Sequence, residues 1–177
     1  MCRKLFESET PLRELPLIRT IQAPDYAVIL DQHIDHYSRV EKFDRSFHPI
    51  VESALENFRT STLHTVNQAF VLDINDTFGG SIFCVHQNNG TARLKLFYLI
   101  PQLRKQGYGK MLLNHAIEHI ANHGYRQIIV STYTIHADAC ELYRRMGFVQ
   151  IDEKPVSAYG QELIEVSLRL VLNPSVS

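Results

Sequence analysis

The sequence has little cysteine and no tryptophan, and its cysteines form no recognisable set. Cys2, Cys84 and Cys140 are an odd number of residues without a CxxC pair, which argues against a disulfide framework and a paired-cysteine zinc site. The nine histidines show no metal-binding spacing such as HExxH. We therefore expect reduced thiols, a cytoplasmic protein and no bound metal.

An excess of charge of one sign is also missing. Lysine and arginine total 18 and aspartate and glutamate total 19, which gives a net charge of -1. A general binder of nucleic acid or of anionic membranes needs a basic excess, so neither is expected as a partner. No apolar run approaches the roughly 18 residues of a transmembrane helix, and the N-terminus has no apolar core typical of a signal peptide.

Linker-like stretches rich in proline, glycine and serine are absent from the body of the chain. The composition, 45% hydrophobic and 21% charged, is that of a folded protein, and 177 residues fit one domain. We predict a loosely ordered N-terminus over residues 1–12, a single domain over 13–172 and a frayed tail over 173–177.

Hydrophobic periodicity then predicts the elements of that domain. Strands are predicted at 17–21, 68–73, 80–86, 91–100, 128–130, 148–151 and 163–170. Helices are predicted from Pro24–Asp25 through Tyr37 and over 44–59, 109–123 and 136–146. The second helix is expected to bury one face made of Phe47, Ile50, Val51, Ala54, Leu55 and Phe58. The order βααβββαβαββ indicates an α/β (α+β) fold with a mixed, mostly antiparallel sheet.

The segment from Leu99 to Lys110 joins a strand to a helix through a basic loop with two glycines. The first N–H groups of a helix lack partners within the helix and carry the positive end of its dipole. Glycines let the backbone approach an anion, and Arg104, Lys105 and Lys110 add positive charge. The pattern favours a phosphate or pyrophosphate site; an ordinary loop with two flexible glycines is the alternative.

Two familiar phosphate-binding motifs do not fit this loop. A Walker A loop needs serine or threonine after the lysine, and Lys110 is followed by Met111. A dinucleotide fingerprint needs a third glycine, where Leu112 stands, and a βαβ unit rather than the predicted meander. The loop therefore belongs to neither of these nucleotide-binding classes.

The chain resembles the GNAT superfamily of acetyl-CoA-dependent N-acetyltransferases. The resemblance rests on Arg104-x-x-Gly107-x-Gly109 after a strand ending at Pro101, and on the second signature from Ala139 to Phe148. It implies the GNAT fold, a sheet of about seven strands flanked by about four helices. A closer similarity is to acetyltransferase domains fused to MarR-type winged-helix regulators. That similarity is carried by His33-x-x-x-Tyr37, Phe47, the run 92–96 and the loop 157–160.

The resemblance implies a site for acetyl-CoA. The loop backbone should hold the pyrophosphate, and the edge of the preceding strand should pair with the pantetheine amides. His136 stands where relatives often have an asparagine that contacts the cofactor. The implied cofactor-binding residues are Tyr98, Leu99, Ile100, Arg104, Lys105, Gln106, Gly107, Tyr108, Gly109, Lys110, His136 and Ala139.

The chemistry of acetyl transfer to an amine sets the catalytic candidates. A lysine-like amine has a pKa near 10.4, so removing its proton at pH 7 costs about 4.6 kcal/mol and favours a base or a water chain. His33 is the base candidate, because imidazole titrates near neutral pH; a hydrogen-bonded helix histidine is the alternative. Tyr143 matches the family's proton donor to the CoA thiolate, with a core tyrosine as the alternative.

The acceptor pocket is less defined. Tyr37, one helical turn after His33, and Tyr159 are expected to line it. The acidic residues before and after Tyr37 could attract a cationic amine, although a solvated helix face explains them equally well; they are Asp31, Asp35, Glu41 and Asp44. Cys140 is expected to be a buried, inert thiol.

The sequence thus predicts an enzyme that passes acetyl from acetyl-CoA directly to a primary amine, a small molecule or an amino acid. The alternative is a non-catalytic acyl-CoA-binding sensor or partner module. Relatives are often dimers, which favours a possible homodimer here.

Overall fold

The structure, a computed structural model, describes residues 16–61, 63–88 and 90–172. The strands are β1 (Leu17–Thr20), β2 (Gln68–Ile74), β3 (Thr77–Asn88), β4 (Thr91–Leu99), β5 (Gln127–Tyr133), β6 (Val149–Ala158) and β7 (Gln161–Val171). The helices are α1 (Asp25–Arg39), α2 (Phe47–Thr60), α3 (Tyr108–Asn122) and α4 (Ala137–Arg145), with a short 3-10 turn η1 (Pro101–Leu103). The predictions for residues 1–12 and 173–177 concern segments outside the described residues.

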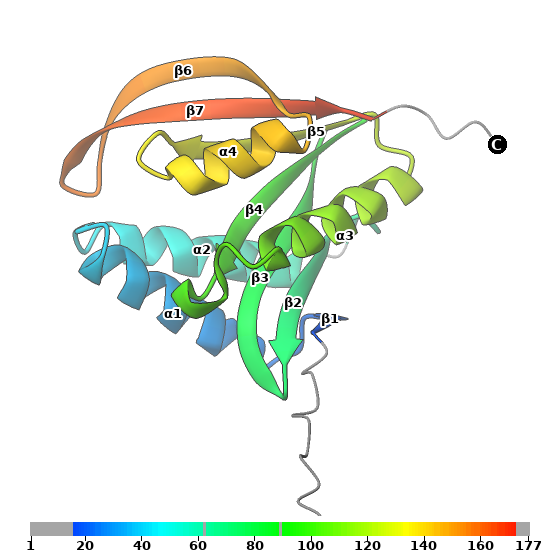
Figure 1. Ribbon diagram of the computed structural model, residues 1–177, viewed down its shortest axis with the longest axis horizontal. Coiled ribbons are helices and arrows are strands. Elements are labelled where there is room, and N and C mark those ends of the chain that lie inside the picture. The colour runs from blue at the N-terminus through cyan, green and yellow to red at the C-terminus, as the bar shows by residue number, and fades with distance from the viewer. Residues whose placement is uncertain (1–15, 62, 89, 173–177) are drawn as a thin grey trace, which may run out of the picture.

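The strands form one seven-stranded sheet in the order β1-β2-β3-β4-β5-β7-β6 (Figure 1). Every neighbouring pair is antiparallel except β4 and β5, which run parallel. The predicted element order and the mixed, mostly antiparallel sheet are therefore confirmed. Within the described residues, no helix is both long and apolar enough to span a bilayer.

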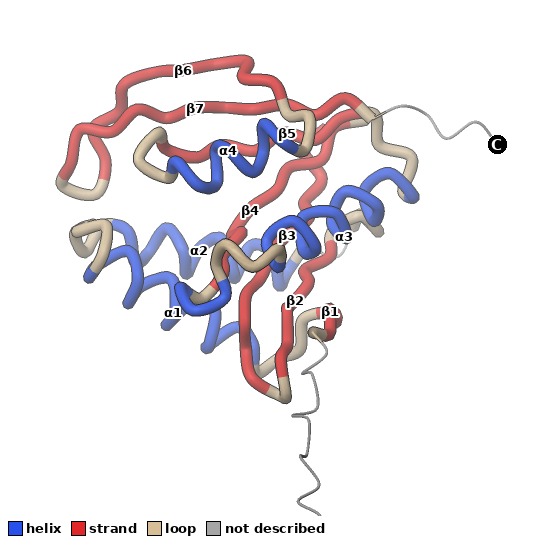
Figure 2. The backbone as a smooth tube through the Cα atoms, in the orientation of Figure 1, coloured by secondary structure: helices blue, strands red, loops and turns tan. Residues whose placement is uncertain are grey.

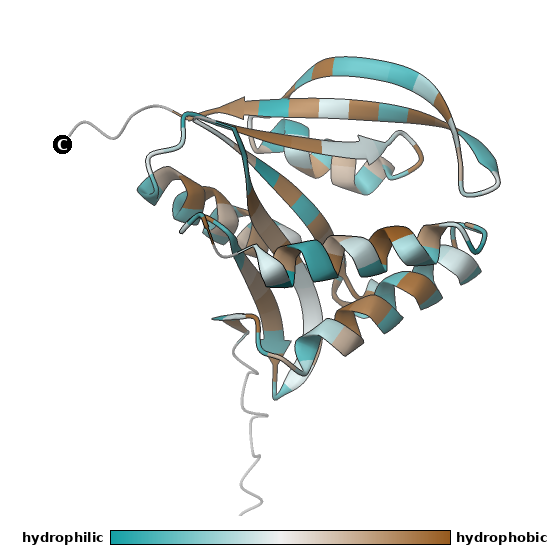
Figure 3. Cartoon of the chain, turned by 180° about the vertical axis from the view of Figure 1, so that it is seen from behind, coloured by the Kyte–Doolittle hydropathy of each residue, from teal (hydrophilic) through white to brown (hydrophobic). Residues whose placement is uncertain are grey.

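The two faces of the sheet are covered by different helices, and β2 supplies both cores. Ala69 and Val71 pack with α1 and α2, whereas Phe70 and Leu72 pack in the cluster that includes α3 and α4. This alternation follows from the two-residue period of a strand covered on both sides. Figure 3, seen from behind, shows the brown, hydrophobic central strands between the helices.

Three predicted details are wrong. Ile50 is 54% exposed, so it does not share the buried face of α2. That helix begins at Phe47 rather than Asp44, because the Asp44 carboxylate accepts the Ser46 N–H (2.9 Å) in the turn before it. The strand predicted at 148–151 extends over all of β6. Most of β6 is polar and exposed, so it lacks the apolar alternation that signals a strand.

The sheet separates between β4 and β5 (Figure 2). The two strands pair only from Thr91–Gln127 to Arg93–Ile129. The β3–β4 register then shifts at a bulge, where Leu96 has a φ of 45° and its carbonyl accepts the Ser81 hydroxyl at 3.0 Å. A bulge bends its strand and re-aims the residues that follow it. The far half of β4 consequently has an edge facing β5 without a strand partner in the described sheet.

Arg19 of β1 forms ion pairs with one residue of α1 and one of β2. Its guanidinium contacts Asp25 at 2.7 Å and Asp73 at 3.1 Å, and both aspartates are buried. Removing one member of a buried ion pair leaves an uncompensated charge. The interaction with Arg19 also lowers the pKa of Asp25.

We expect Arg19→Leu to lower the free energy of unfolding by about 3 kcal/mol at pH 7, measured by urea denaturation. Because Arg19 lowers the pKa of Asp25, its contribution is present above a pH of about 4 and is lost as the pH falls further. The control is Arg39→Leu, which removes an exposed pair with Asp35 and should cost less than about 1 kcal/mol. Equal losses in the two variants would contradict the assignment.

Candidate active site

The loop before α3 presents a row of backbone donors. Gly107 stands just before the helix with a φ of 90°, and Lys105 has a φ of 60°. In the part of the chain that the structure describes, none of the six N–H groups from Lys105 to Lys110 has a hydrogen-bond partner. Nothing lies within 4 Å of a Cβ built on Gly107. Backbone donors at a helix N-terminus, with open space at Gly107, are suited to hold an anion.

The basic side chains of this loop have different orientations. Arg104 turns back: its Nε donates to Leu99 O (3.1 Å), one terminal nitrogen lies 3.1 Å from His36 Nε2, and its guanidinium carbon is 5.7 Å from the centre of the Tyr98 ring. Lys105 lies across the loop, with Nζ 3.4 Å from the Asp138 carboxylate at the start of α4. Arg104 therefore stabilises the loop through its contacts with β4 and α1, and its guanidinium does not join the row of N–H donors.

Gln106, Tyr108 and Gly109 stabilise the loop and the start of α3 by hydrogen bonding and packing. Gln106 Nε2 donates to Gln102 O at 2.6 Å, which closes the turn. A Cβ on Gly109 would lie 3.3 Å from side-chain carbons of both Leu99 and Leu142, so glycine allows α3 to approach α4 and β4 closely. Tyr108 is partly buried and packs against the core. Glycine at 107 is required by its φ, whereas glycine at 109 is required by packing.

The predicted edge residues Tyr98, Leu99 and Ile100 differ in whether their backbone N–H is free to bind a ligand. The Ile100 N–H donates to Gly79 O (3.0 Å), and the Ile100 carbonyl accepts the Leu103 N–H (3.1 Å). N–H directions alternate along a strand, so the Leu99 N–H points away from β3, toward the gap between β4 and β5. Tyr98 pairs with Ser81 of β3 and contributes a buried ring. Leu99 is thus the residue positioned to offer a backbone N–H at the gap.

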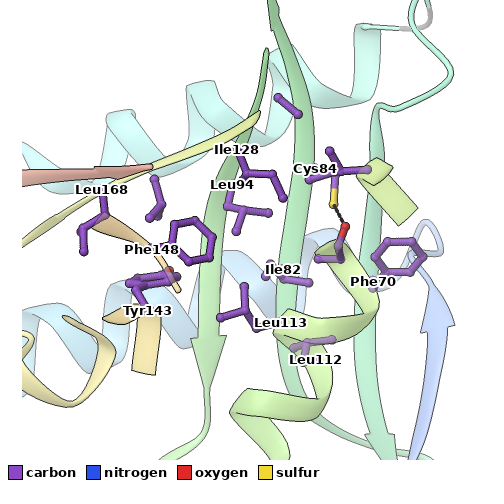
Figure 4. Packing of buried hydrophobic residues seen from close by; sticks show 14 of the residues in the cluster. Phe70, Ile82, Cys84, Leu94, Leu112, Leu113, Ile128, Tyr143, Phe148 and Leu168 are labelled. Atoms are coloured by element: carbon purple, nitrogen blue, oxygen red, sulfur yellow. Dashed lines mark hydrogen bonds between the residues drawn. The ribbon is translucent and has the colours of Figure 1, made fainter. Parts of the chain in front are cut away.

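Tyr143 lies on α4 and is 3% exposed. Its ring packs against Phe148, with ring centres 5.3 Å apart (Figure 4). Its hydroxyl has no hydrogen-bond partner among the described residues, and burial raises its pKa, with a smaller effect from Tyr37. The phenol therefore keeps its proton at neutral pH and can donate it.

The neighbours of Tyr143 on α4 are apolar in character. Ala139 is partly buried against the main core. Cys140 is buried, its thiol lies 3.7 Å from Tyr133 O, and burial raises its pKa. A thiol with a raised pKa is a poor nucleophile, which fits the prediction of an inert cysteine.

His33 is a buried histidine of α1. Its Nδ1 lies 2.8 Å from Ile29 O and donates to it, and its ring centre lies 5.0 Å from that of Tyr98. Burial lowers its pKa to about 4. The ring is therefore neutral at pH 7 and holds its proton on Nδ1, which leaves the Nε2 lone pair as its basic site.

We expect the His33 and His136 ring resonances to stay unshifted between pH 8 and 5.5 in an NMR titration, because both pKa values lie near 4. In the unfolded chain both rings would bind protons near pH 6.5. Protein stability should therefore fall as the pH drops from about 6.5 to 4. A midpoint near 6.5 for His33 would contradict its buried, neutral state.

Sequence reasoning named His136 and Glu41 separately, but it missed that they lie together beside this site. His136 precedes α4, and its Nδ1 lies 3.1 Å from Thr132 Oγ1. Its Nε2 is buried without a hydrogen-bond partner among the described residues, 4.0 Å from Glu41 Oε1. The same oxygen is 3.9 Å from His36 Nε2. No sequence motif links Glu41 to His136, because they lie almost a hundred residues apart.

The predicted pocket residues Tyr37 and Tyr159 belong to one aromatic group. Tyr37 and Phe47 have ring centres 4.8 Å apart, and Phe43 and Tyr159 are equally close. Tyr133 lies 6.2 Å from Tyr159. We call Tyr37, Phe43, Phe47, Tyr133 and Tyr159 the aromatic group. The structure therefore brings α1, α2, β5 and the β6–β7 turn together beside the gap.

This turn is held in place from both sides. The Asp44 N–H donates to Tyr159 O (3.0 Å), and Gln161 Nε2 donates to the Glu41 carbonyl (2.6 Å). In Figure 1 the β6–β7 turn lies over the segment between α1 and α2. The aromatic group is thus assembled by contacts between distant parts of the chain.

The model of the acetyltransferase (GNAT) family matches residues 30–148, which include the separated strands β4 and β5 and the loop before α3. The chain belongs to this family. Human N-acetyltransferase 8 is 38% identical over 58 residues, which are 32% of this chain and 26% of the human protein.

Solved structures of acetyltransferases have the same fold at low sequence identity. A Salmonella typhimurium protein described as an acetyltransferase, solved with acetyl-CoA as its cofactor, aligns with a TM-score of 0.74 and 17% identity over 92% of this chain and 96% of that one. The Escherichia coli ribosomal-protein-S18-alanine N-acetyltransferase aligns with a TM-score of 0.69 and 18% identity over the same shares. A GNAT-family acetyltransferase from Staphylococcus aureus aligns with a TM-score of 0.71 and 21% identity over 90% of this chain and 100% of that one.

Proposed function

We propose that the protein transfers an acetyl group from acetyl-CoA to a primary amine by direct attack, without an acyl-enzyme. The observation that carries this proposal is the row of N–H groups from Lys105 to Lys110, which have no partner among the described residues and lie next to the edge of β4 that no described strand pairs with. A pyrophosphate needs several converging donors, and an extended amide chain needs a free strand edge. The loop and the free strand edge lie next to each other, as they must to bind CoA, in which the pyrophosphate is linked directly to pantetheine.

The residues present fit acetyl-CoA. The N–H groups of the loop, with Lys105 and Lys110, would hold the pyrophosphate, and Gly107 leaves the space above them open. The Leu99 N–H would bond to pantetheine or to the thioester oxygen, where a donor stabilises developing negative charge. Ile100 offers no free N–H, so its part is to fix the loop. The bound cofactor supplies an activated thioester carbonyl.

Two side chains would transfer the protons of the reaction, one to the leaving sulfur and one from the amine. Tyr143 keeps its proton at neutral pH and would donate it to the sulfur that leaves. The neutral His33 would accept the amine proton at Nε2, directly or through water. With a pKa near 4 this ring is a weak base, so it would hold the proton only briefly and give it to water from Nε2, because Nδ1 already donates to Ile29 O.

The test is a coupled assay on the purified protein with a panel of primary amines. We expect release of free CoA thiol in equal amount to an acetylated amine detected by mass spectrometry. Binding of acetyl-CoA without transfer to any amine would instead favour the acyl-CoA-binding module.

We also propose that the protein is cytoplasmic and able to form a homodimer. Two buried free thiols, Cys84 and Cys140, suit a reducing compartment. The edge strand β6 exposes Val149 and Ile151, which supports association along that edge. The closer similarity to regulator-fused domains stays a prediction, since the family model covers acetyltransferases in general.

A further inference from the structure

We propose that Glu41, His136 and Tyr37 form the binding site for the acceptor's ammonium group, and that the acceptor is an aromatic primary amine without a carboxylate beside its nitrogen. This inference rests on the proposed function and specifies its substrate class. It starts from the segment between α1 and α2, where the Glu41 side chain is 22% exposed and its carbonyl is fixed by Gln161 (2.6 Å).

The distance between Glu41 and His136 indicates a missing donor. Their facing atoms, Oε1 and Nε2, are 4.0 Å apart, which is too long for a hydrogen bond. The Nε2 atom is nevertheless buried and has no partner among the described residues. Leaving a buried polar atom unsatisfied is unfavourable. A nitrogen with two hydrogens, placed about 2.8 Å from each atom, would satisfy both.

One carboxylate, that of Glu41, faces His136 across this gap, and one cation, Arg104, also acts on the His136 ring. The ring of His136 is neutral at pH 7, because burial lowers its pKa to about 4. With the ring proton on Nδ1, donated to Thr132 Oγ1 at 3.1 Å, Nε2 is an acceptor. The other facing imidazole, His36, also has a pKa lowered by burial and then by Arg104. Arg104 bonds to Leu99 O and lies 3.1 Å from His36 Nε2. The Glu41 carboxylate is thus the acidic group facing His136.

The surrounding rings indicate what is attached to the ammonium group. Tyr37 lies with its ring centre 5.6 Å from that of His136, and Tyr133 lies 5.8 Å from it. Aromatic faces attract ammonium groups and stack with aryl rings. The aromatic group continues from Tyr37 toward Phe47 and Tyr159. An amine with a ring a few atoms from its nitrogen would contact both features.

Glu41, the carboxylate that would hold the ammonium group, disfavours α-amino acids as acceptors. Their carboxylate, one carbon from the nitrogen, would approach Glu41 and be repelled. A simple alkylamine keeps the ammonium contacts but loses the stacking with the rings. Tyramine, tyrosine and hexylamine differ in these two respects and serve as probes.

The first experiment measures kcat/KM for the three amines with the wild-type protein. We expect tyramine to exceed tyrosine and hexylamine by at least about 10-fold. In Glu41→Gln, the KM for tyramine should rise at least about 10-fold while the affinity for acetyl-CoA stays within about two-fold. The control Glu56→Gln makes the same change at an exposed position of α2 and should leave the KM unchanged.

A binding measurement keeps the inference separate from the proposed function. Calorimetric titration of tyramine into the protein saturated with CoA needs no turnover. Binding that is weakened at least about 10-fold by Glu41→Gln supports the ammonium site even if no amine is acetylated, in which case only the proposed function fails. Absence of tyramine binding to the wild-type complex, equal effects of Glu41→Gln and Glu56→Gln, or a preference for tyrosine or hexylamine would overturn the inference.

Discussion

Replacement of Tyr143 by phenylalanine is expected to lower kcat about 100-fold, which is the usual contribution of a positioned proton donor. The substitution removes one oxygen from a side chain that is 3% exposed and already packed against Phe148, so the core should keep its shape. The hydroxyl has no partner among the described residues that would be left unsatisfied. The affinity for acetyl-CoA, measured by calorimetry, should stay within about two-fold.

Tyr125→Phe is the matched control for Tyr143→Phe. It also removes a phenol oxygen, but that oxygen lies 2.7 Å from His86 Nδ1, at the end of α3 opposite the loop. Its kcat should equal that of the parent. If Tyr143→Phe also keeps the parental kcat, Tyr143 is a core residue only. If it loses acetyl-CoA affinity instead, the role of its hydroxyl is in binding.

Replacement of Gly107 by valine is expected to weaken acetyl-CoA binding at least about 10-fold. The residue has a φ of 90°, and a branched side chain disfavours that conformation by about 1–2 kcal/mol. The new methyl groups would also occupy the open space above the loop N–H groups, where we place the pyrophosphate. Both effects act on the same row of donors, and calorimetric titration of acetyl-CoA measures the result.

Gly124→Val separates strain from loss of the site. Gly124 follows the other end of α3 with a φ of 76° and likewise has nothing within 4 Å of a built Cβ. The two valine variants should therefore lose similar thermal stability, whereas only Gly107→Val should lose acetyl-CoA affinity. Equal affinities in the two variants would remove the loop from the cofactor site.

The architecture was predictable because most elements carry a clear hydrophobic period. The helix α3 and the meander β2–β4 follow their apolar patterns closely, and the glycine after α3 has the positive φ expected at such an end. The strand β6 lacked this signal because it is an exposed edge strand. Periodicity reports burial, so it cannot find an element that buries little.

The candidate site was predictable only in part, for a related reason. The loop from Arg104 to Lys110 is contiguous, so its chemistry can be recognised in the sequence. By contrast, Glu41 meets His136 only after the chain has folded. Burial also changes the chemistry of single residues: an imidazole expected to titrate near 6.5 at His33 has a pKa near 4. Neither effect is local in sequence.

The measurement that tests the central claim most directly is calorimetric titration of the purified protein with acetyl-CoA, free CoA and ATP. We predict micromolar binding of acetyl-CoA and CoA and no binding of ATP, because the site needs a pantetheine chain along β4 as well as a pyrophosphate at the loop. Absence of CoA binding would contradict the account, since the loop would then be purely structural and the acetyltransferase activity would have no donor.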